Sequence, residues 1–594
     1  MMNSILFMLS FLFLLVGLLL YPRSQKKLGF VQEAVMNFLV VMCYGAVGAG
    51  LISNLKLPVN LISMSLLYLI LAIVIWSIII CKKNVQKLTI SKIEVISILI
   101  LSIIFLLIEL KVFSLELRAA YDYNTDAGNH LVEALQVVRR QKVSGIYFAA
   151  LYNGLTIELL QPFLEEIQYY KGFVLADNFH YYFELLFYYA VVFSLAKKKH
   201  TKYAAPVITL LLWCGYPLYS YIEGHYVYWG WGAVLLCFVL YEMEQYVEKE
   251  ETIFNCVIRV LAGFIGILLC YTLFAPFAVV AILLVVVGEF RRRKIKLNKK
   301  IWLCVAGFGA LCGAAAVYIY YSYFVARGIS IFEGLKVKGG CYVNLYTDFI
   351  WTLPVLLVFC YSCIKKETRP HIYGKIYVAF IGIQTILLVM FYAGQLSAYY
   401  FYKFYYPLWI LNWLVVALAI DTLKVEKGEY KYIWSYAVIV AIAYISCFGK
   451  LPELMNGTEA GWISEEANVG TNLYSRNMST LSKDFEAGKY SNAQFEICEY
   501  VMNNIRDEGE KCLFAGWWDC RGQSNWYRAI TNMGALTDKI MAAEGDTWKQ
   551  ILEADNVDYY VVLKTSDLYK DNTEYFDNQN RIFENEEGFV VQVH

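Results

Sequence analysis

Residues 59–81 read VNLISMSLLYLILAIVIWSIIIC, a run that contains no charged side chain. A helix of this length crosses about 30 Å of hydrocarbon and satisfies its own backbone hydrogen bonds there. The nearest charges on either side are Lys56 and Lys82. The run therefore predicts a membrane-spanning helix.

Runs of the same kind recur along most of the chain. The 594 residues are 59% hydrophobic and 17% charged, and their mean hydropathy is +0.48. We expect a polytopic α-helical membrane protein with about fourteen spans. The expected spans are 2–21, 32–53, 59–81, 93–113, 180–196, 205–221, 227–245, 254–272, 275–290, 301–324, 349–364, 375–395, 407–421 and 432–449.

Lysine and arginine clusters indicate which loops are cytoplasmic, because such loops hold the excess of positive charge. With alternating spans, the clusters fall on one side; they are 23–27, 82–87, 197–199, 291–294, 365–369 and 424–431. This distribution predicts a multi-pass protein of the cell membrane. Segments 114–179 and 325–348 and the chain after about residue 451 are expected on the outer face.

The last part of the chain has a different composition. Residues 1–450 are predicted to form the transmembrane domain, and residues 451–594 a small soluble α/β domain outside the cytoplasm. The pattern predicts a helix at 495–506 and strands at 511–515, 559–563 and 588–594. Trp517 and Trp518 follow the first strand and are expected to pack.

The external loop 114–179 is predicted to carry interfacial helices. Residues 130–142 read HLVEALQVVRRQK, with Leu131, Ala134, Leu135 and Val138 on one face. Residues 155–170 show a similar pattern. Both segments are expected to lie flat across the outer ends of the spans.

An acidic segment precedes the first of these helices. Asp122 and Asp126 are four residues apart in YDYNTDAGNH, residues 121–130. A carboxylate that is partly desolvated at the membrane surface can act as a general base, and such a pair can also hold a divalent cation. The structural alternative is that Asp126 caps the helix that follows, since Asp favours that position.

Further candidates lie in other external segments. Glu223 and His225 occupy the turn between the sixth and seventh spans, and ionisable groups beside a membrane cavity are candidate binding residues; the alternative is a solvated turn. Arg327, Lys336 and Lys338 lie in the glycine-rich loop 325–348, where outer cations favour an anionic ligand such as a lipid phosphate.

Lys403 is a further cation among tyrosines. It either binds a phosphate or extends to the lipid headgroups.

Several classes of function are disfavoured by composition. The net charge of +1 gives no basic field for nucleic acid. The sequence contains no P-loop and no GxGxxG before a helix, so no soluble cofactor is predicted. Cys341, Cys498, Cys512 and Cys520 are expected outside the membrane, where a disulfide can form if the compartment is oxidising.

The chain resembles the GT-C superfamily of polyprenyl-phosphate-sugar-dependent membrane glycosyltransferases, bacterial members with a soluble C-terminal domain in particular. The resemblance rests on the order of spans, the long early external loop and the terminal domain. Two stretches carry it in residues. One is the acidic segment from Asp122 to His130, and the other is the tail with Tyr500–Ile505, Cys512–Trp518 and Val557–Val562.

The resemblance implies a set of roles. Asp126 would be the base that deprotonates the acceptor, with Asp122 in support and His130 among the substrate-binding residues. Arg327, Lys336, Lys338 or Lys403 would neutralise the leaving lipid phosphate. The partners implied are a polyprenyl-phosphate-sugar donor, membrane lipids, and a cell-envelope glycan, lipid or protein as acceptor; the displacement would invert the sugar carbon.

The main alternative is a transporter or flippase of a lipid-linked saccharide. It predicts ionisable residues near the middle of spans or inverted repeats, and the sequence shows few of the former and no convincing repeat. A polymerase or ligase of surface polysaccharide and a non-enzymatic assembly protein are further alternatives.

Overall fold

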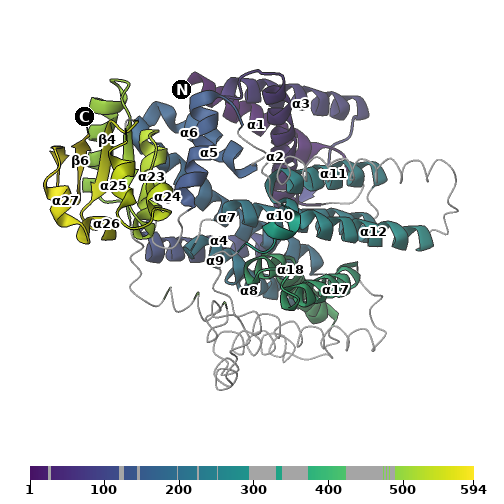
Figure 1. The fold of residues 1–594 in the computed structure, drawn as a ribbon. Coiled ribbons are helices and arrows are strands. Elements are labelled where there is room, and N and C mark those ends of the chain that lie inside the picture. Colours follow the sequence, from purple (N-terminus) through teal and green to yellow (C-terminus); the bar gives the residue numbers. More distant parts are fainter. Residues whose placement is uncertain are drawn as a thin grey trace.

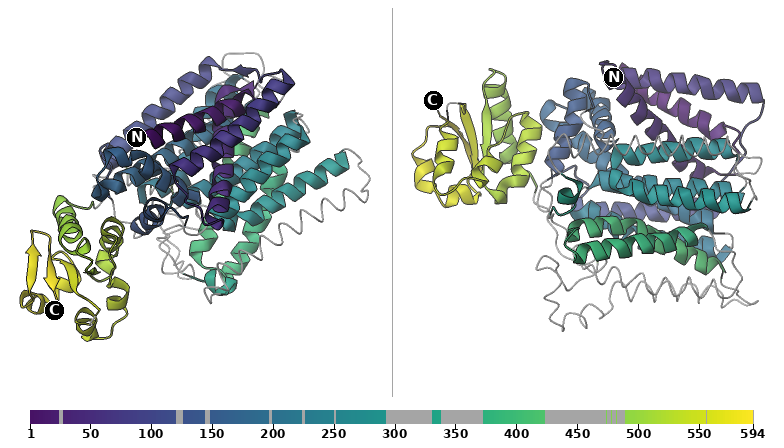
Figure 2. Two further views of the ribbon diagram at one scale, coloured as in Figure 1. Left: turned by 90° about the horizontal axis from the view of Figure 1, so that it is seen from above. Right: turned by 45° about the vertical axis from the view of Figure 1, so that its right-hand side comes forward.

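The computed structural model describes residues 1–23, 28–119, 126–143, 148–196, 199–223, 226–249, 252–292, 330–337, 372–422, 489–554 and 556–593, with residues 473, 477 and 481. Within these ranges the chain forms a bundle of long helices and a small domain of helices and strands (Figure 1). The small domain lies at one end of the bundle, beside α5 and α6 (Figure 2).

Each predicted span that falls on described residues coincides with helix. The bundle consists of α1 (Met2–Leu20), α2 (Phe30–Asn54), α3 (Leu61–Lys82), α4 (Lys92–Phe113), α7 (Tyr169–Leu195), α8 (Lys199–Trp213), α9 (Tyr216–Glu223), α10 (Val227–Lys249), α11 (Ile253–Cys270), α12 (Ala275–Arg292), α17 (Ile372–Tyr392) and α18 (Ala398–Thr422). The predicted spans 301–324, 349–364 and 432–449 lie outside the described residues.

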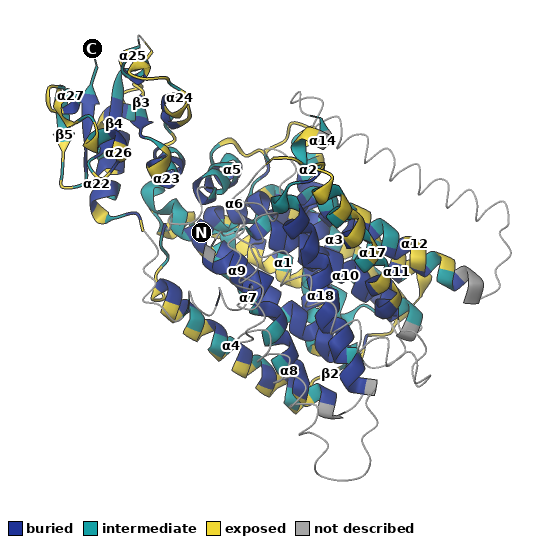
Figure 3. Cartoon of the chain, turned by 60° about the horizontal axis from the view of Figure 1, so that its bottom comes forward, coloured by how far each residue is buried: buried dark blue, intermediate teal, exposed yellow. Residues whose placement is uncertain are grey.

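The exposed surface of the bundle is apolar. Among the described helices, eight are long and apolar enough to cross a membrane, or up to nine if the bent pair α8 and α9 is one span. Leu9, Ile70 and Leu107 are 60%, 61% and 59% exposed. Figure 3 shows exposed residues along α1 and α4, whereas α10 and α18 are mostly buried. The protein is therefore a polytopic α-helical membrane protein, as predicted.

Local sequence explains where these helices begin and break. The Asn60 side chain accepts hydrogen bonds from the backbone N–H groups of Ile62 and Ser63, which caps α3. The span predicted at 205–221 is not one straight helix, because α8 and α9 meet at a bend of 49°. Pro217 explains the break, since it has no N–H to continue the helical ladder.

Four charged side chains form a buried network at one end of the bundle. Glu242 lies inside α10 and is fully buried. Its carboxylate contacts Arg23 at 2.6 Å and Arg259 at 2.9 Å. Arg23 also contacts Glu33 at 3.2 Å. The network joins the α1–α2 connection to α10 and α11.

The external loop 114–179 is only partly as predicted. Helix α5 (Ala127–Arg140) is amphipathic, and its Leu131, Ala134 and Leu135 are buried as expected. Residues 155–170 do not form one helix. Helix α6 (Phe148–Leu160) ends there, two short 3₁₀ turns follow at Gln161–Phe163 and Glu166–Gln168, and α7 begins at Tyr169. Pro162 at the start of the first turn explains the interruption.

The C-terminal domain is built on a four-stranded sheet of order β3-β4-β6-β5. Strands β3 (Cys512–Ala515) and β4 (Tyr559–Leu563) are parallel, whereas β6 (Gly588–Gln592) is antiparallel to β4 and to β5 (Arg581–Glu584). The predicted strands and the helix near 495–506 are confirmed. The helices are α22 (Asn492–Val501), followed by a π turn at Met502–Arg506, α23 (Arg521–Thr531), α24 (Thr537–Met541), α25 (Thr547–Leu552), α26 (Asp567–Lys570) and α27 (Thr573–Asp577).

Two expectations for this domain change. Cys498, Cys512 and Cys520 are buried free thiols, so no disulfide joins them, and Cys341 lies outside the described residues. Trp517 packs against the domain core. Trp518 does not pack there as predicted, because it is 60% exposed and has the guanidinium of Arg521 4.8 Å from its ring centroid.

Helix α5 connects the bundle to this domain through a close backbone contact with α23. A Cβ atom on Gly128 would lie 2.4 Å from the backbone carbon of Asn525, so only glycine fits there. At the other end of α5, Arg139 donates to the carbonyls of Ala529 and Ile530, at 3.1 and 3.2 Å. The domain is thus attached to α5 along the length of that helix.

An ion pair adds to this attachment. Glu166 accepts two hydrogen bonds from Arg506, both at 3.1 Å, and one from Arg139 at 3.0 Å. Trp526 of α23 is buried against Phe173 of α7, with ring centroids 6.3 Å apart.

We expect Glu242→Gln to destabilise the bundle, because it leaves two buried guanidinium groups short of a counter-charge. The cost of breaking such a buried pair is about 3–5 kcal/mol. Thermal unfolding in detergent measures it. The control is Glu116→Gln, since Glu116 is exposed and pairs only at the surface with Arg118. Equal melting temperatures for the two variants would contradict a stabilising network.

We expect Gly128→Ala to loosen the C-terminal domain, because the added methyl meets backbone atoms that cannot rotate away. Overpacking of this kind costs about 1–3 kcal/mol. Hydrogen exchange of α5 and α23 should rise in the variant. Gly50→Ala is the control, since a Cβ at Gly50 has nothing within 4 Å. Unchanged exchange in Gly128→Ala would show that the contact is not needed for docking.

Candidate functional site

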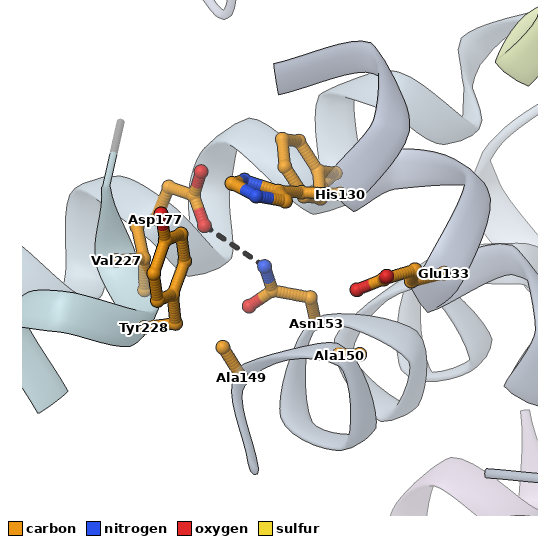
Figure 4. Close-up of a pocket in the computed structure, with 9 residues that line it drawn as sticks. His130, Glu133, Ala149, Ala150, Asn153, Asp177, Val227 and Tyr228 are labelled. Atoms are coloured by element: carbon orange, nitrogen blue, oxygen red, sulfur yellow. Dashed lines mark hydrogen bonds between the residues drawn. The ribbon is translucent and has the colours of Figure 1, made fainter. Parts of the chain in front are cut away.

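A polar cavity of about 200 Å³ lies where α5, α6, α7 and α10 meet. Its polar lining residues come from all four helices and point toward a common space (Figure 4). They are His130, Glu133, Asn153, Asp177 and Tyr228. The walls between them are apolar, from Ala149, Ala150, Phe173 and Val227.

An amide and a carboxylate form one side of the cavity. The Asn153 amide donates a hydrogen bond to Asp177 Oδ1 over 2.9 Å. Asp177 is 1% exposed and Asn153 is 5% exposed. Each group restricts the rotamer of the other, so the pair presents its remaining polar atoms in a fixed arrangement.

His130 lines the cavity from one turn into α5. Its ring meets the ring of Tyr228 edge-on, with centroids 5.1 Å apart. Burial lowers the pKa of His130 from an ordinary value of 6.5 to about 4; the charge of Lys403 also lowers it, and that of Asp126 raises it. His130 is therefore neutral at physiological pH. Lys403 and Asp126 both lie close enough to it to act on its charge.

Lys403 lies behind Tyr228 in a cage of tyrosine rings. Its ammonium donates to the hydroxyls of Tyr399 and Tyr228, the latter over 3.4 Å. Ring centroids lie 4.1 Å away for Tyr399, 5.5 Å for Tyr226, 5.6 Å for Tyr228 and 5.9 Å for Tyr271. Aromatic faces stabilise a cation held in this way. Lys403 is 4% exposed within α18, so the alternative in which it extends to the headgroups is wrong.

Asp126 is the N-cap residue of α5, but its side chain makes no capping hydrogen bond. The carboxylate is therefore not engaged as a cap, which was the structural alternative. Its charge acts on both His130 and Tyr228. Asp126 thus belongs to the same neighbourhood as the cavity.

Of the other predicted site residues, the structure describes Lys336 and the backbone of Glu223. Lys336 is exposed, and the carbonyl of its neighbour Leu335 accepts a hydrogen bond from Ser397 N over 2.8 Å, directly before α18. Glu223 is the last residue of α9, and its side chain is outside the described part of the chain. Asp122, His225, Arg327 and Lys338 lie outside the described residues.

Sequence reasoning missed Asn153, Asp177, Glu133 and Tyr228. Asp177 is the one that the sequence could have revealed, since it is an acidic residue within the long apolar and aromatic segment that forms α7. Asn153 gave no signal, because only the packing of α6 on α7 brings it to the carboxylate.

The described residues contain no group of three or more His, Cys, Asp or Glu side chains placed to hold a metal ion. Of the two carboxylates predicted as ligands of a divalent cation, the structure describes only Asp126. The described part of the site thus provides no set of metal ligands.

Comparison with protein-family models and with curated protein sequences finds no match for this chain. Among solved structures, the chain is similar to the archaeal oligosaccharyltransferase AglB from Archaeoglobus fulgidus, solved in complex with an inhibitory peptide and a dolichol-phosphate. The two share 14% sequence identity with a TM-score of 0.34, over 82% of this chain and 71% of that chain.

We expect His130 to stay neutral well below its ordinary pKa. Its folded pKa of about 4 lies below 6.5, so His130 does not alter stability above pH 6.5 and destabilises the fold progressively as the pH falls toward 4. As the pH is lowered from 6.5 to 4, the melting temperature of the wild type should therefore fall more steeply than that of His130→Gln. Parallel pH profiles would contradict a buried, neutral imidazole.

Proposed function

We propose that the protein is a membrane glycosyltransferase that transfers a sugar from a polyprenyl-phosphate-linked donor to a cell-envelope acceptor. The observation that carries the proposal is the gathering of Asp126, His130, Tyr228 and Lys403 around one polar cavity at the end of a bundle of apolar helices. Such a site combines a carboxylate with a buried cation, which transfer from a lipid-phosphate donor needs.

The proposed chemistry is a direct displacement. The Asp126 carboxylate takes a proton from an acceptor hydroxyl or amine, and the acceptor atom then attacks the anomeric carbon of the sugar. The bond from that carbon to the phosphate oxygen breaks, and the lipid phosphate leaves with the electron pair. The configuration at the carbon inverts. Asp122 supports Asp126 in this scheme.

Lys403 is the cation proposed to stabilise the leaving phosphate. Its ammonium is held at a fixed position by Tyr399 and Tyr228, so little reorganisation is needed as negative charge develops. Lys336, Arg327 and Lys338 are assigned to the entry of the anionic lipid from the outer leaflet. His130, Glu223 and His225 are proposed to contact substrate.

The proposed location of the reaction is the outer face of the membrane. The lysine and arginine clusters predict that the loop with Asp126 and the C-terminal domain lie on the same, non-cytoplasmic side. The packing of α5 on α23 supports this, because it requires both to be on one side. The acceptor would therefore be a glycan, lipid or protein of the cell envelope.

The test is sugar release from radiolabelled polyprenyl-phosphate sugars by purified protein in nanodiscs, with a cell-envelope fraction as acceptor. We expect Asp126→Asn to lower turnover about 100-fold or more, since loss of a general base typically costs 10²–10⁴-fold. Lys403→Met should lower it by about 100-fold or more through loss of phosphate stabilisation.

Glu116→Gln is the control for Asp126→Asn, because Glu116 is an exposed carboxylate outside the site. All variants are first shown to insert and to melt as the wild type does. Absence of turnover in the wild type would overturn the proposed function. Turnover by Asp126→Asn equal to that of the wild type would overturn Asp126 as the base.

One observation favours the alternative of a transporter or flippase. His180 and Glu184 are fully buried inside α7, with 3.5 Å between His180 Nε2 and Glu184 Oε2. Glu184 also accepts hydrogen bonds from the hydroxyls of Tyr188, at 3.1 Å, and Tyr406. Buried ionisable pairs within a span are typical of proton and substrate pathways.

The two functions predict different results for Glu184→Gln. A transporter would lose movement of a fluorescent lipid-linked saccharide across a proteoliposome membrane. A glycosyltransferase would keep sugar transfer within a few-fold of the wild type, since Glu184 is not among the cavity residues.

A further inference from the structure

The cavity has the size and the lining expected for a small, hydroxyl-rich ligand. Its volume is about 200 Å³. Since about 10–15 Å³ of such space is enough for one water molecule, the cavity has room for a small polar ligand such as one sugar ring.

The lining of the cavity suits a neutral ligand better than a phosphate. Two acidic side chains, Glu133 and Asp177, line it, and none of its described lining residues is lysine or arginine. His130 adds no positive charge, because its pKa is lowered to about 4. The described lining thus supplies no cation to a phosphate, whereas a neutral sugar with several O–H donors meets acceptor groups there.

Asp177 and Asn153 offer the polar atoms that a sugar requires. A carboxylate has about four acceptor sites, so Asp177 can accept from a sugar hydroxyl while it holds the Asn153 amide. Asn153 adds a carbonyl oxygen and a second N–H. Because both groups are buried and oriented by each other, they would select particular hydroxyl positions.

Tyr228 connects the cavity to the proposed phosphate site. Its ring lines the cavity beside His130, and its hydroxyl accepts a hydrogen bond from Lys403. A sugar in the cavity would thus have its anomeric carbon directed toward Tyr228, with its phosphate on the Lys403 side. Phe173 forms another wall and contacts Trp526 of the C-terminal domain.

We propose that this cavity binds the sugar unit of the donor and that Asp177 and Asn153 are its specificity-determining residues, through hydrogen bonds to ring hydroxyls. The inference rests on the proposed function, and names the part of the substrate that the cavity takes. The phosphate and the lipid remain outside the cavity.

The experiment compares the binding of two lipids to protein in nanodiscs by titration. One is a polyprenyl phosphate that carries a monosaccharide, from a panel with a hexose, an N-acetylhexosamine and a pentose; the other is the same lipid phosphate without sugar. We expect Asp177→Asn to weaken binding of the preferred sugar-bearing lipid about 10- to 100-fold, the usual effect of losing a hydrogen bond to a charged group. Binding of the sugar-free lipid should not change.

The chain provides a matched control in a second carboxylate–amide pair. Asn178 donates to Glu109 over 2.8 Å, and Glu109 is buried but is not among the cavity residues. Glu109→Gln should leave the preference for the sugar-bearing lipid intact. Asn153→Ser provides a second variant of the cavity if Asp177→Asn does not fold.

The outcomes separate the two proposals. If the wild type binds neither lipid, the proposed function fails, and the sugar site fails with it. If the wild type prefers the sugar-bearing lipid but the cavity variants keep that preference, the sugar site alone is wrong. Equal weakening for both lipids would assign Asp177 a structural role and would also overturn the inference. Donor analogues that lack one hydroxyl should bind the wild type less tightly, and Asp177→Asn should not distinguish them.

Discussion

The contact of Gly128 with the backbone of α23 is the constraint on which the site depends. Helix α5 is not one of the membrane-spanning helices. It packs against α6 on one side and against the C-terminal domain on the other. Its position decides where His130 and Glu133 lie, since both are carried on it. The backbone of Tyr490 also donates to Ala119, just before the acidic segment. The C-terminal domain therefore contacts the chain on both sides of that segment.

Charge is separated across this site over a short distance. Carboxylates line the cavity, and the ammonium of Lys403 lies behind Tyr228 among aromatic rings. In a buried setting of low dielectric the ammonium attracts an anion, while the carboxyl oxygens accept from hydroxyl groups, so each side accepts a different part of a ligand. A molecule with a neutral polyol joined to a phosphate matches this arrangement. The buried network around Glu242 is far along α10 from Tyr228, and its role is to hold helices together.

Much of the fold was predictable because each element is encoded by its own segment. The spans follow from long apolar runs, and β4 from a short run of aromatic and β-branched residues between Asp558 and Lys564. Predictions of helix bounds failed where a single proline interrupts a helix within an otherwise continuous pattern. Pro162 ends a helix that the amphipathic pattern of 155–170 predicted to continue, and Pro217 bends a span. Asp126 and His130 were predicted as site residues because they lie beside an amphipathic helix in a long loop.

The sequence by itself determined that the chain spans a membrane many times and ends in an α/β domain, because length and hydropathy of single segments suffice for that. Only the tertiary structure decided which polar residues meet. Asn153 and Asp177 are 24 positions apart, and Lys403 reaches Tyr228 across 175 positions. No local pattern encodes such pairs, since they arise from the packing of α6 on α7 and of α18 on α10. The cavity is thus a property of how the helices pack, not of any one of them.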